Sequence, residues 1–194
     1  MGGHSFGLEF SYPRAYEPTV STAAKSFSIP KELIWSIMRA ESAYRKDALS
    51  PVGAMGLMQL MPFTATQVSV RLLGDGAVDA KTIRQPEVNI RLGSRYLQRL
   101  MTQFQGKIPL AVAAYNAGPH RVHGWLNTFG RLDMDEFVEH IPFLETRNYV
   151  KRVLQNYEMY SRLYTAKSQA ELPRLSKPVG VKLDDTIPTR ENWD

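Results

Sequence analysis

Glu41 is the residue whose type and position point most directly to chemistry. It lies near the C-terminal end of a predicted helix over 30–44. Leu33, Ile37 and Met38 precede it on the same helical face, so its carboxyl group extends an apolar stripe. Burial and the negative end of the helix dipole both raise the pKa of such a carboxyl group. A carboxylic acid that keeps its proton near neutral pH can act as a general acid, as glycoside cleavage requires.

The alternative for Glu41 is an ion pair inside the fold. Arg39, Arg45 or a more distant arginine could neutralise a partly buried carboxylate. Structural ion pairs also perturb pKa values, and on position alone the ion pair is the more common use of such a glutamate. The residues around Glu41 must therefore decide between the two interpretations.

Four segments in a fixed order supply that context. They are RAESAY at 39–44, SPVGAMGLMQLMP at 50–62, AAYNAGP at 113–119 and IPFLETRNYV at 141–150. In this order and spacing they resemble the soluble lytic transglycosylase family, which has a lysozyme-like catalytic domain. The resemblance covers about residues 28–164.

The resemblance implies an enzyme that binds peptidoglycan glycan strands. The implied reaction cleaves the β-1,4 bond between N-acetylmuramic acid and N-acetylglucosamine without water. The C6 hydroxyl of the muramic acid attacks C1 and gives a 1,6-anhydro product. Because this nucleophile is tethered to the substrate, one carboxyl group suffices, whereas hydrolysing glycosidases usually need two. Glu41 is then expected to serve as acid and base in turn.

The second segment supplies three candidate substrate-binding residues. Ser50 is expected to hydrogen-bond an N-acetyl group or to hold the site; its alternative is an ordinary turn or cap serine. Gln59 offers a donor and an acceptor to a sugar. Met61 suits the face of a sugar ring, with core packing as its alternative.

The third and fourth segments supply four more substrate-binding candidates: Tyr115, Asn116, Glu145 and Tyr149. Tyr115 can stack on a sugar and hydrogen-bond at once, or be a buried core tyrosine. Asn116 lies beside it and alternatively secures the turn before Gly118. Glu145 and Tyr149 are four residues apart and share a helix face. The resemblance places both in the cleft, and their alternative is an interhelical hydrogen-bond pair.

Helical periodicity dominates the elements that must position these residues. Beside 30–44, the sequence predicts helices over 62–73, 86–104, 109–117, 119–129, 133–140 and 143–164. The turn residues of 50–56 allow at most a small strand element near 50–60. The expected fold class is mainly α, a compact multi-helix domain of the α+β lysozyme-like superfamily with a substrate cleft.

Three segments are expected along the chain. Residues 1–27 are predicted to be an irregular lead-in that packs on the domain, 28–164 the catalytic domain, and 165–194 an extended tail that either wraps the domain or is disordered. The start of the chain lacks the features of a signal peptide. Either the protein is cytoplasmic, or this is a mature or excised fragment, and the family resemblance implies the latter, from a periplasmic or cell-envelope protein.

Charge and composition limit the partners. The chain of 194 residues has a formal net charge of +5 and no cysteine, which excludes thiol catalysis and disulfides. No basic run or nucleic-acid module is present, so nucleic acid is not expected as a partner. The histidines His120 and His123 lack a third ligand, and neither a metal nor another cofactor is expected. No transmembrane segment is expected, and the domain is expected to be monomeric.

Three other functions remain open from the sequence. A goose-type lysozyme would share the fold and the glutamate but use water as the nucleophile. A glycan-binding module would bind the strand without cleaving it, and the presence of Glu41 argues against this function. A purely structural helical domain would leave the four ordered segments unexplained.

Overall fold

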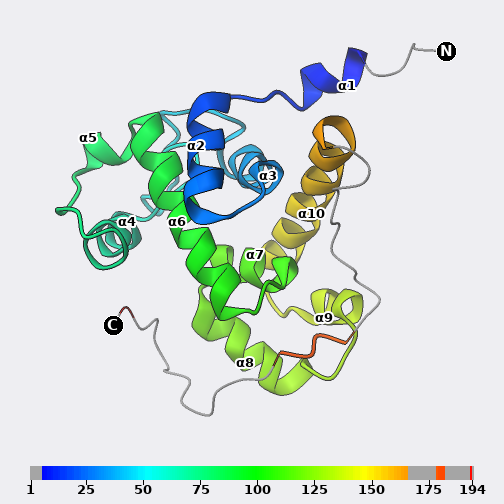
Figure 1. Cartoon of the computed structure of the whole chain (residues 1–194). Coiled ribbons are helices and arrows are strands. Elements are labelled where there is room, and N and C mark those ends of the chain that lie inside the picture. Colours follow the sequence, from blue (N-terminus) through cyan, green and yellow to red (C-terminus); the bar gives the residue numbers. More distant parts are fainter. Residues whose placement is uncertain (1–5, 166–177, 182–192, 194) are drawn as a thin grey trace.

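The protein is described by a computed structural model, which covers residues 6–165, 178–181 and 193 (Figure 1). Helix α3 (Lys31–Ser42) lies inside it, with the apolar side chains of Leu33, Trp35 and Met38 fully buried. The long helix α10 (Leu144–Tyr164) packs along α3. These two helices carry the residues around Glu41.

A second group of helices supports this pair. Helix α2 (Glu17–Phe27) packs on α3 and on α6 (Pro86–Gln103), and α7 (Ile108–Ala117) contacts both α6 and α10. The residues from 109 to 114 in α7 are all buried. A helix that is apolar on all sides belongs in a core, and α7 takes that place.

Shorter elements complete the fold. They are α1 (Phe6–Ser11), α4 (Pro62–Gln67), the π-helix η1 (Val68–Leu72), α5 (Ala80–Ile83), α8 (Pro119–Phe129) and α9 (Met134–His140). In Figure 1, α4 and α5 lie on one side of α6, and α8 and α9 lie at the bottom of the molecule. Within the described residues, no helix has both the length and the apolar character needed to cross a bilayer.

The segment between α3 and α4 contains the loop of residues 48–61, called the 48–61 loop below. Its only pairings in the described part of the chain are isolated antiparallel bridges, Leu49 with Met55 and Met55 with Leu60. This agrees with the expected small strand element. Gly56 has a φ of +79°, and a Cβ there would lie 2.4 Å from Nδ2 of Asn89. Only glycine fits this point of the loop.

All the predicted helices are present, with small shifts at their ends. The helix expected over 62–73 divides into α4 and the π-helical η1. The mainly α prediction is therefore confirmed, but the irregular character predicted for 1–27 is wrong. Helix α2 has few apolar residues, and its N-cap Tyr16 provides no side-chain capping bond, so its formation depends on burying Val20 and Ala23. The four-residue α5 was also missed.

The segment after α10 lies largely outside the described residues. Its described parts contact the domain: Val179 is fully buried, its N–H donates to the carbonyl oxygen of Leu132, and Trp193 stacks on Tyr96 with ring centroids 5.7 Å apart. These contacts favour the wrapping alternative for 178–181 and 193. The boundaries drawn at 27/28 and 164/165 stay predictions.

Candidate active site

Glu41 is the penultimate residue of α3, on the side that faces α10. The hydroxyl group of Tyr149, a buried residue of α10, donates a hydrogen bond of 2.6 Å to Oε1 of Glu41. The packing of α3 on α10 therefore fixes one carboxylate oxygen. The sequence predicts both residues in one site but does not predict the hydrogen bond between them.

The surroundings of Glu41 favour its protonated form. Burial is the largest effect and raises the pKa of Glu41 to about 7. The Tyr149 hydrogen bond and the positive charge of Arg152 act in the opposite direction, and the negative charge of Glu145 adds to the increase. The shift has the direction predicted from the sequence and leaves a carboxyl group that can both donate and accept a proton near neutral pH.

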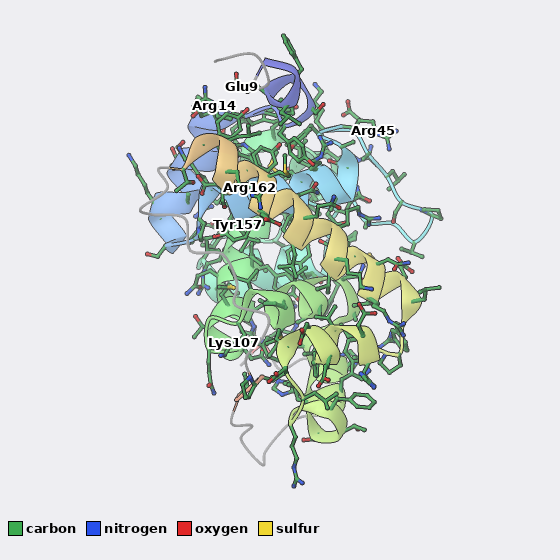
Figure 2. All side chains as sticks on the ribbon, turned by 90° about the vertical axis from the view of Figure 1, so that its right-hand side faces the viewer. Glu9, Arg14, Arg45, Lys107, Tyr157 and Arg162 are labelled. Carbon is green, nitrogen blue, oxygen red and sulfur yellow. The ribbon has the colours of Figure 1, made fainter. Side chains whose placement is uncertain are left out.

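The nearby arginines do not form the alternative ion pair. Arg39 donates to the carbonyl oxygen of Ser11, and its guanidinium group lies 4.4 Å from the centroid of the Tyr12 ring. Nε of Arg45 donates to the carbonyl oxygen of Ser42 at 3.2 Å, and Figure 2 shows Arg45 at the outer edge of the molecule. Within the described residues, no ion pair includes Glu41.

Glu41 lines a cavity of about 890 Å³, called the Glu41 cavity below. Residues of the 48–61 loop form another part of its lining. The lining residues are Tyr16, Glu41, Tyr44, Arg45, Lys46, Asp47, Ala48, Leu49, Ser50, Pro51 and Gln59. The structure thus brings Glu41, Ser50 and Gln59 together as predicted, and adds Tyr16 and Tyr44, which sequence analysis did not assign to the site.

Ser50 and Gln59 shape this part of the lining through bonds within the 48–61 loop. Oγ of Ser50 accepts a hydrogen bond from the N–H of Ala54 at 2.9 Å. Gln59 adopts a φ of +47°, and its Nε2 donates to the carbonyl oxygens of Gly56 at 2.9 Å and Ala48 at 3.2 Å. Ser50 therefore has the turn role named as its alternative while it lines the cavity, and the amide nitrogen of Gln59 is committed to the loop.

Tyr115 supports the same loop from the core side. Its hydroxyl group donates to the carbonyl oxygen of Met58 at 2.9 Å, and its ring lies 5.5 Å from that of Tyr96. Burial, followed by the negative charge of Glu41, raises the pKa of Tyr115 well above its usual value. Tyr115 thus lies close enough to Glu41 for the charge of Glu41 to raise its pKa, and its substrate-binding role stays a prediction.

Five of the seven predicted substrate-binding residues lie outside the cavity lining: Met61, Tyr115, Asn116, Glu145 and Tyr149. Oδ1 of Asn116 accepts a hydrogen bond of 2.6 Å from Oγ1 of Thr146 and so ties α7 to α10. Met61 is 41% exposed at the start of α4. Glu145 is exposed in the first turn of α10 and acts on Glu41 through its charge. Within the described residues, Glu145 and Tyr149 form no hydrogen bond with each other.

Sequence analysis missed three residues that hold or tune the site. Oγ of Ser42 donates to the carbonyl oxygen of Leu57 at 2.8 Å. Asn89 of α6 is fully buried and bonds the backbone of the 48–61 loop on both sides, as acceptor for the N–H of Met58 at 2.7 Å and as donor to the carbonyl oxygen of Met55 at 3.0 Å. Arg152 is the third.

These omissions had recognisable signals. Asn89 is a polar residue on the apolar face of a helix, which demands hydrogen-bond partners. Arg152 follows Glu145 and Tyr149 at i+7 and i+3, and therefore shares their helix face. The geometry as a whole is that of a helical domain with one acid of raised pKa at the edge of a cavity.

Comparison with known proteins agrees with this class. The family model described as Transglycosylase SLT domain matches residues 18–138. The chain is 44% identical over 158 residues to the soluble lytic murein transglycosylase of Escherichia coli (strain K12), with 81% of this chain and 24% of that protein covered. It is 32% identical over 167 residues to the membrane-bound lytic murein transglycosylase C of Actinobacillus pleuropneumoniae serotype 5b (strain L20), covering 76% of this chain and 46% of that protein.

Solved structures agree in fold. The 70 kDa soluble lytic transglycosylase of Escherichia coli superposes with a TM-score of 0.78 at 41% identity, covering 88% of this chain and 27% of that one. The chain belongs to the SLT transglycosylase domain family, and its lysozyme-like fold is the one predicted from the sequence. It spans about a quarter of the length of the soluble relatives it matches.

Proposed function

We propose that this chain carries the catalytic domain of a peptidoglycan lytic transglycosylase. The observation that carries the proposal is Glu41 itself: a carboxyl group with a pKa of about 7, held by Tyr149 at the edge of a cavity, in a chain of the SLT domain family. The proposed substrate is the β-1,4 bond between N-acetylmuramic acid and N-acetylglucosamine.

The proposed reaction needs one carboxyl group and no water. Glu41 gives its proton to the glycosidic oxygen as the bond from that oxygen to C1 of muramic acid breaks. The O6 hydroxyl of the same sugar then forms the new bond to C1, and its proton passes to the Glu41 carboxylate. The products are a 1,6-anhydromuramic end and a free hydroxyl on N-acetylglucosamine, and Glu41 regains its starting form. Tyr149 keeps the carboxyl group oriented through both proton transfers.

The runner-up is hydrolysis by a lysozyme-like mechanism, and one observation favours it. Asp47 is exposed and lines the same cavity as Glu41, so a second carboxylate is present that could activate water. The leading proposal predicts that Asp47→Asn leaves the anhydro product unchanged. Hydrolysis through Asp47 predicts reducing ends from the wild type and their loss in the variant.

The decisive experiment digests purified peptidoglycan and identifies the ends by mass spectrometry. The wild type is expected to release anhydromuramic ends. Glu41→Gln is expected to lower the rate about 100-fold or more, because it removes the transferable proton. The fold should survive, since a glutamine oxygen can still accept the Tyr149 hydrogen bond. Wild-type activity in this variant would refute the assignment, and glycan binding without turnover by the wild type would indicate a binding module.

The compartment and the assembly state are further parts of the proposal. The relatives are named as soluble or membrane-bound murein transglycosylases, which supports action at the periplasm or cell envelope, where peptidoglycan lies. We expect the described domain to act as a monomer. Sedimentation equilibrium with and without glycan tests the monomer.

A further inference from the structure

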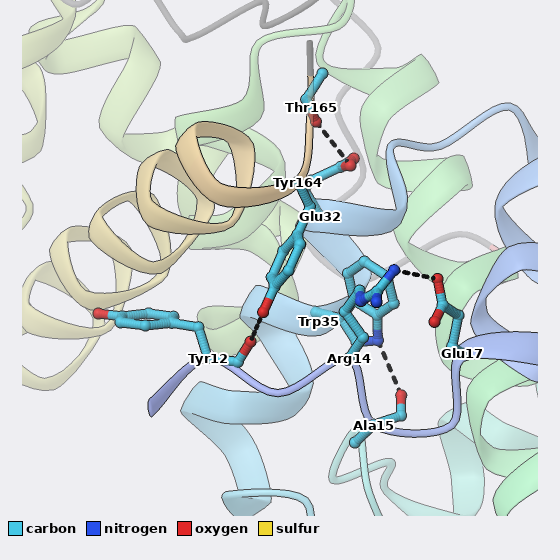
Figure 3. A network of polar contacts seen from close by, with 8 residues as sticks. All are labelled: Tyr12, Arg14, Ala15, Glu17, Glu32, Trp35, Tyr164 and Thr165. Carbon is cyan, nitrogen blue, oxygen red and sulfur yellow. Dashed lines mark hydrogen bonds and ion pairs between the residues drawn. The ribbon is translucent and has the colours of Figure 1, made fainter. Parts of the chain in front are cut away.

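Residues 11–16, called the N-terminal strap below, are held by side chains from α3 and α10. Donors from these two helices bind four of its carbonyl oxygens. The pairs are Arg39 with Ser11, Tyr164 with Tyr12 at 2.8 Å, Tyr160 with Pro13 at 2.9 Å, and Trp35 with Ala15 at 2.9 Å. Figure 3 shows two of these bonds, from Tyr164 and from Trp35. A segment whose carbonyl oxygens are bonded at four of its six residues has little freedom to move.

The strap ends at Tyr16, whose backbone is in the left-handed region with a φ of +55°. This conformation is unfavourable for a residue with a Cβ and persists where the surroundings impose it. The carbonyl oxygen of Tyr16 also accepts the first backbone bond of α2, from the N–H of Val20 at 3.0 Å. The strap on one side and α2 on the other therefore fix Tyr16 in place.

Tyr16 differs from the other tyrosines around Glu41 in its hydroxyl group. The hydroxyl groups of Tyr44, Tyr115 and Tyr149 bond Tyr160, the carbonyl oxygen of Met58 and Glu41, respectively. Tyr16 lines the Glu41 cavity, and its hydroxyl group has no hydrogen-bond partner among the described residues. A half-buried ring with an uncommitted hydroxyl group, fixed at the wall of a cavity, is suited to bind a sugar.

We propose that Tyr16 is a substrate-binding residue of the Glu41 cavity, its ring packing on a pyranose face and its hydroxyl group hydrogen-bonding a sugar hydroxyl or N-acetyl group. The N-terminal strap is the positioning device that holds it there. The inference deepens the proposed function, because the sugar belongs to the glycan strand that Glu41 cleaves.

Binding is measured by calorimetry with defined N-acetylglucosamine oligomers and with a purified muropeptide, in the Glu41→Gln background. Without turnover, the readout does not depend on the chemistry. Tyr16→Phe is expected to weaken binding about threefold to tenfold, the equivalent of one hydrogen bond. Tyr16→Ala is expected to weaken it further, because the ring is lost as well. The matched control is Phe10→Ala, which removes an aromatic ring that is 82% exposed on α1, and it should bind like its parent.

A double-mutant cycle tests the strap. Tyr164→Phe removes the donor to Tyr12 and should weaken binding less than Tyr16→Ala does. Combined with Tyr16→Ala it should add nothing, because the strap acts only through Tyr16. Full additivity would overturn the positioning role. Unchanged binding by Tyr16→Phe and by a folded Tyr16→Ala would overturn the proposal.

The proposed function fails on a different result, the absence of anhydromuramic ends from the wild-type digest. Glycan binding that depends on Tyr16 would survive that failure.

Discussion

Opposing influences set the proton affinity of Glu41. Burial raises its pKa, whereas the Tyr149 hydrogen bond and the charge of Arg152 stabilise the carboxylate form. The balance leaves a pKa of about 7. A group used first as an acid and then as a base works best when its two forms are close in free energy at the operating pH. The site thus raises the pKa of Glu41 far above its ordinary value, yet the carboxyl group can still lose its proton near neutral pH.

The pH profile of activity follows from this value. In the proposed reaction Glu41 starts in its protonated form, so the protonated fraction of the free protein limits kcat/KM. We expect kcat/KM for glycan cleavage to be high below the pKa and to fall about tenfold per pH unit above about 7. Initial rates between pH 5 and roughly 9 measure this limb. A profile that stays flat through pH 8 would contradict the role of Glu41 as the acid.

Two neighbours of Glu41 should move that limb in opposite directions. Tyr149→Phe removes a hydrogen bond that lowers the pKa of Glu41, so the midpoint should shift to higher pH. Glu145→Gln removes a negative charge that raises it, so the midpoint should shift to lower pH. Both variants are measured by the same kcat/KM profile. Shifts of the same sign would mean that the two residues act through a general loosening of α10.

At the scale of elements, the 48–61 loop lines the Glu41 cavity, and among the described residues no sheet supports it. Side chains replace the sheet: Ser42 from α3, Asn89 from α6 and Tyr115 from α7 each bond its backbone. Each of these residues lies on a helix that packs in the core. The packing of α3, α6 and α7 therefore determines the position of the 48–61 loop.

Asn89→Leu tests this support. The variant leaves the N–H of Met58 and the carbonyl oxygens of Met55 and Ile83 without their partner in a buried place. We expect the free energy of unfolding to fall by about 3 kcal/mol or more, with loss of activity. Urea unfolding measures the change. The control is Asn127→Ala, at an exposed position of α8, whose free energy of unfolding should stay within about 0.5 kcal/mol of the wild type. A similarly small effect of Asn89→Leu would show that Asn89 does not support the loop.

The helices differ in how well their sequences predict them. Helices with a broad apolar stripe, such as α3 and α10, were predictable because the stripe is local information. Helix α2 was not, because Val20 and Ala23 form a weak stripe and its stability comes from α6. Glu41 and Tyr149 are 108 residues apart, and their hydrogen bond depends on how distant helices pack. The same holds for the hydrogen bonds that position the 48–61 loop. Family resemblance named several such residues, but it did not give Tyr16, Ser42 or Asn89.

At the scale of the whole molecule, the far end of the chain contributes to the core. Val179 is fully buried and lies against the connection between α8 and α9, where Pro178 pairs with Asp133. The cavity is built from residues 16 to 59, which belong to the opposite part of the chain. In Figure 1, residues 178–181 lie beside α8 and α9 and away from α3, so the packing of Val179 is separate from the cavity that Glu41 lines.

Val179→Ala should therefore change stability without changing chemistry. Removal of two buried methyl groups is expected to lower the free energy of unfolding by about 1–3 kcal/mol, and kcat/KM at a temperature well below unfolding should match the wild type. Thermal unfolding and the glycan digest measure the two quantities. A Val179→Ala variant as stable as the wild type would mean that residues 178–181 are not part of the cooperative unit.

The support of the 48–61 loop by side chains has a consequence for how the site forms during folding. Two of its three supporting side chains, Asn89 and Tyr115, come from helices further along the chain, so the loop can order fully only after those helices have packed against it. During refolding from denaturant, helical circular dichroism should therefore recover first and glycan cleavage last. Under the proposed function, a newly made chain would carry Glu41 from the time α3 forms, yet would cleave no glycan until the 48–61 loop has taken its place in the cavity lining.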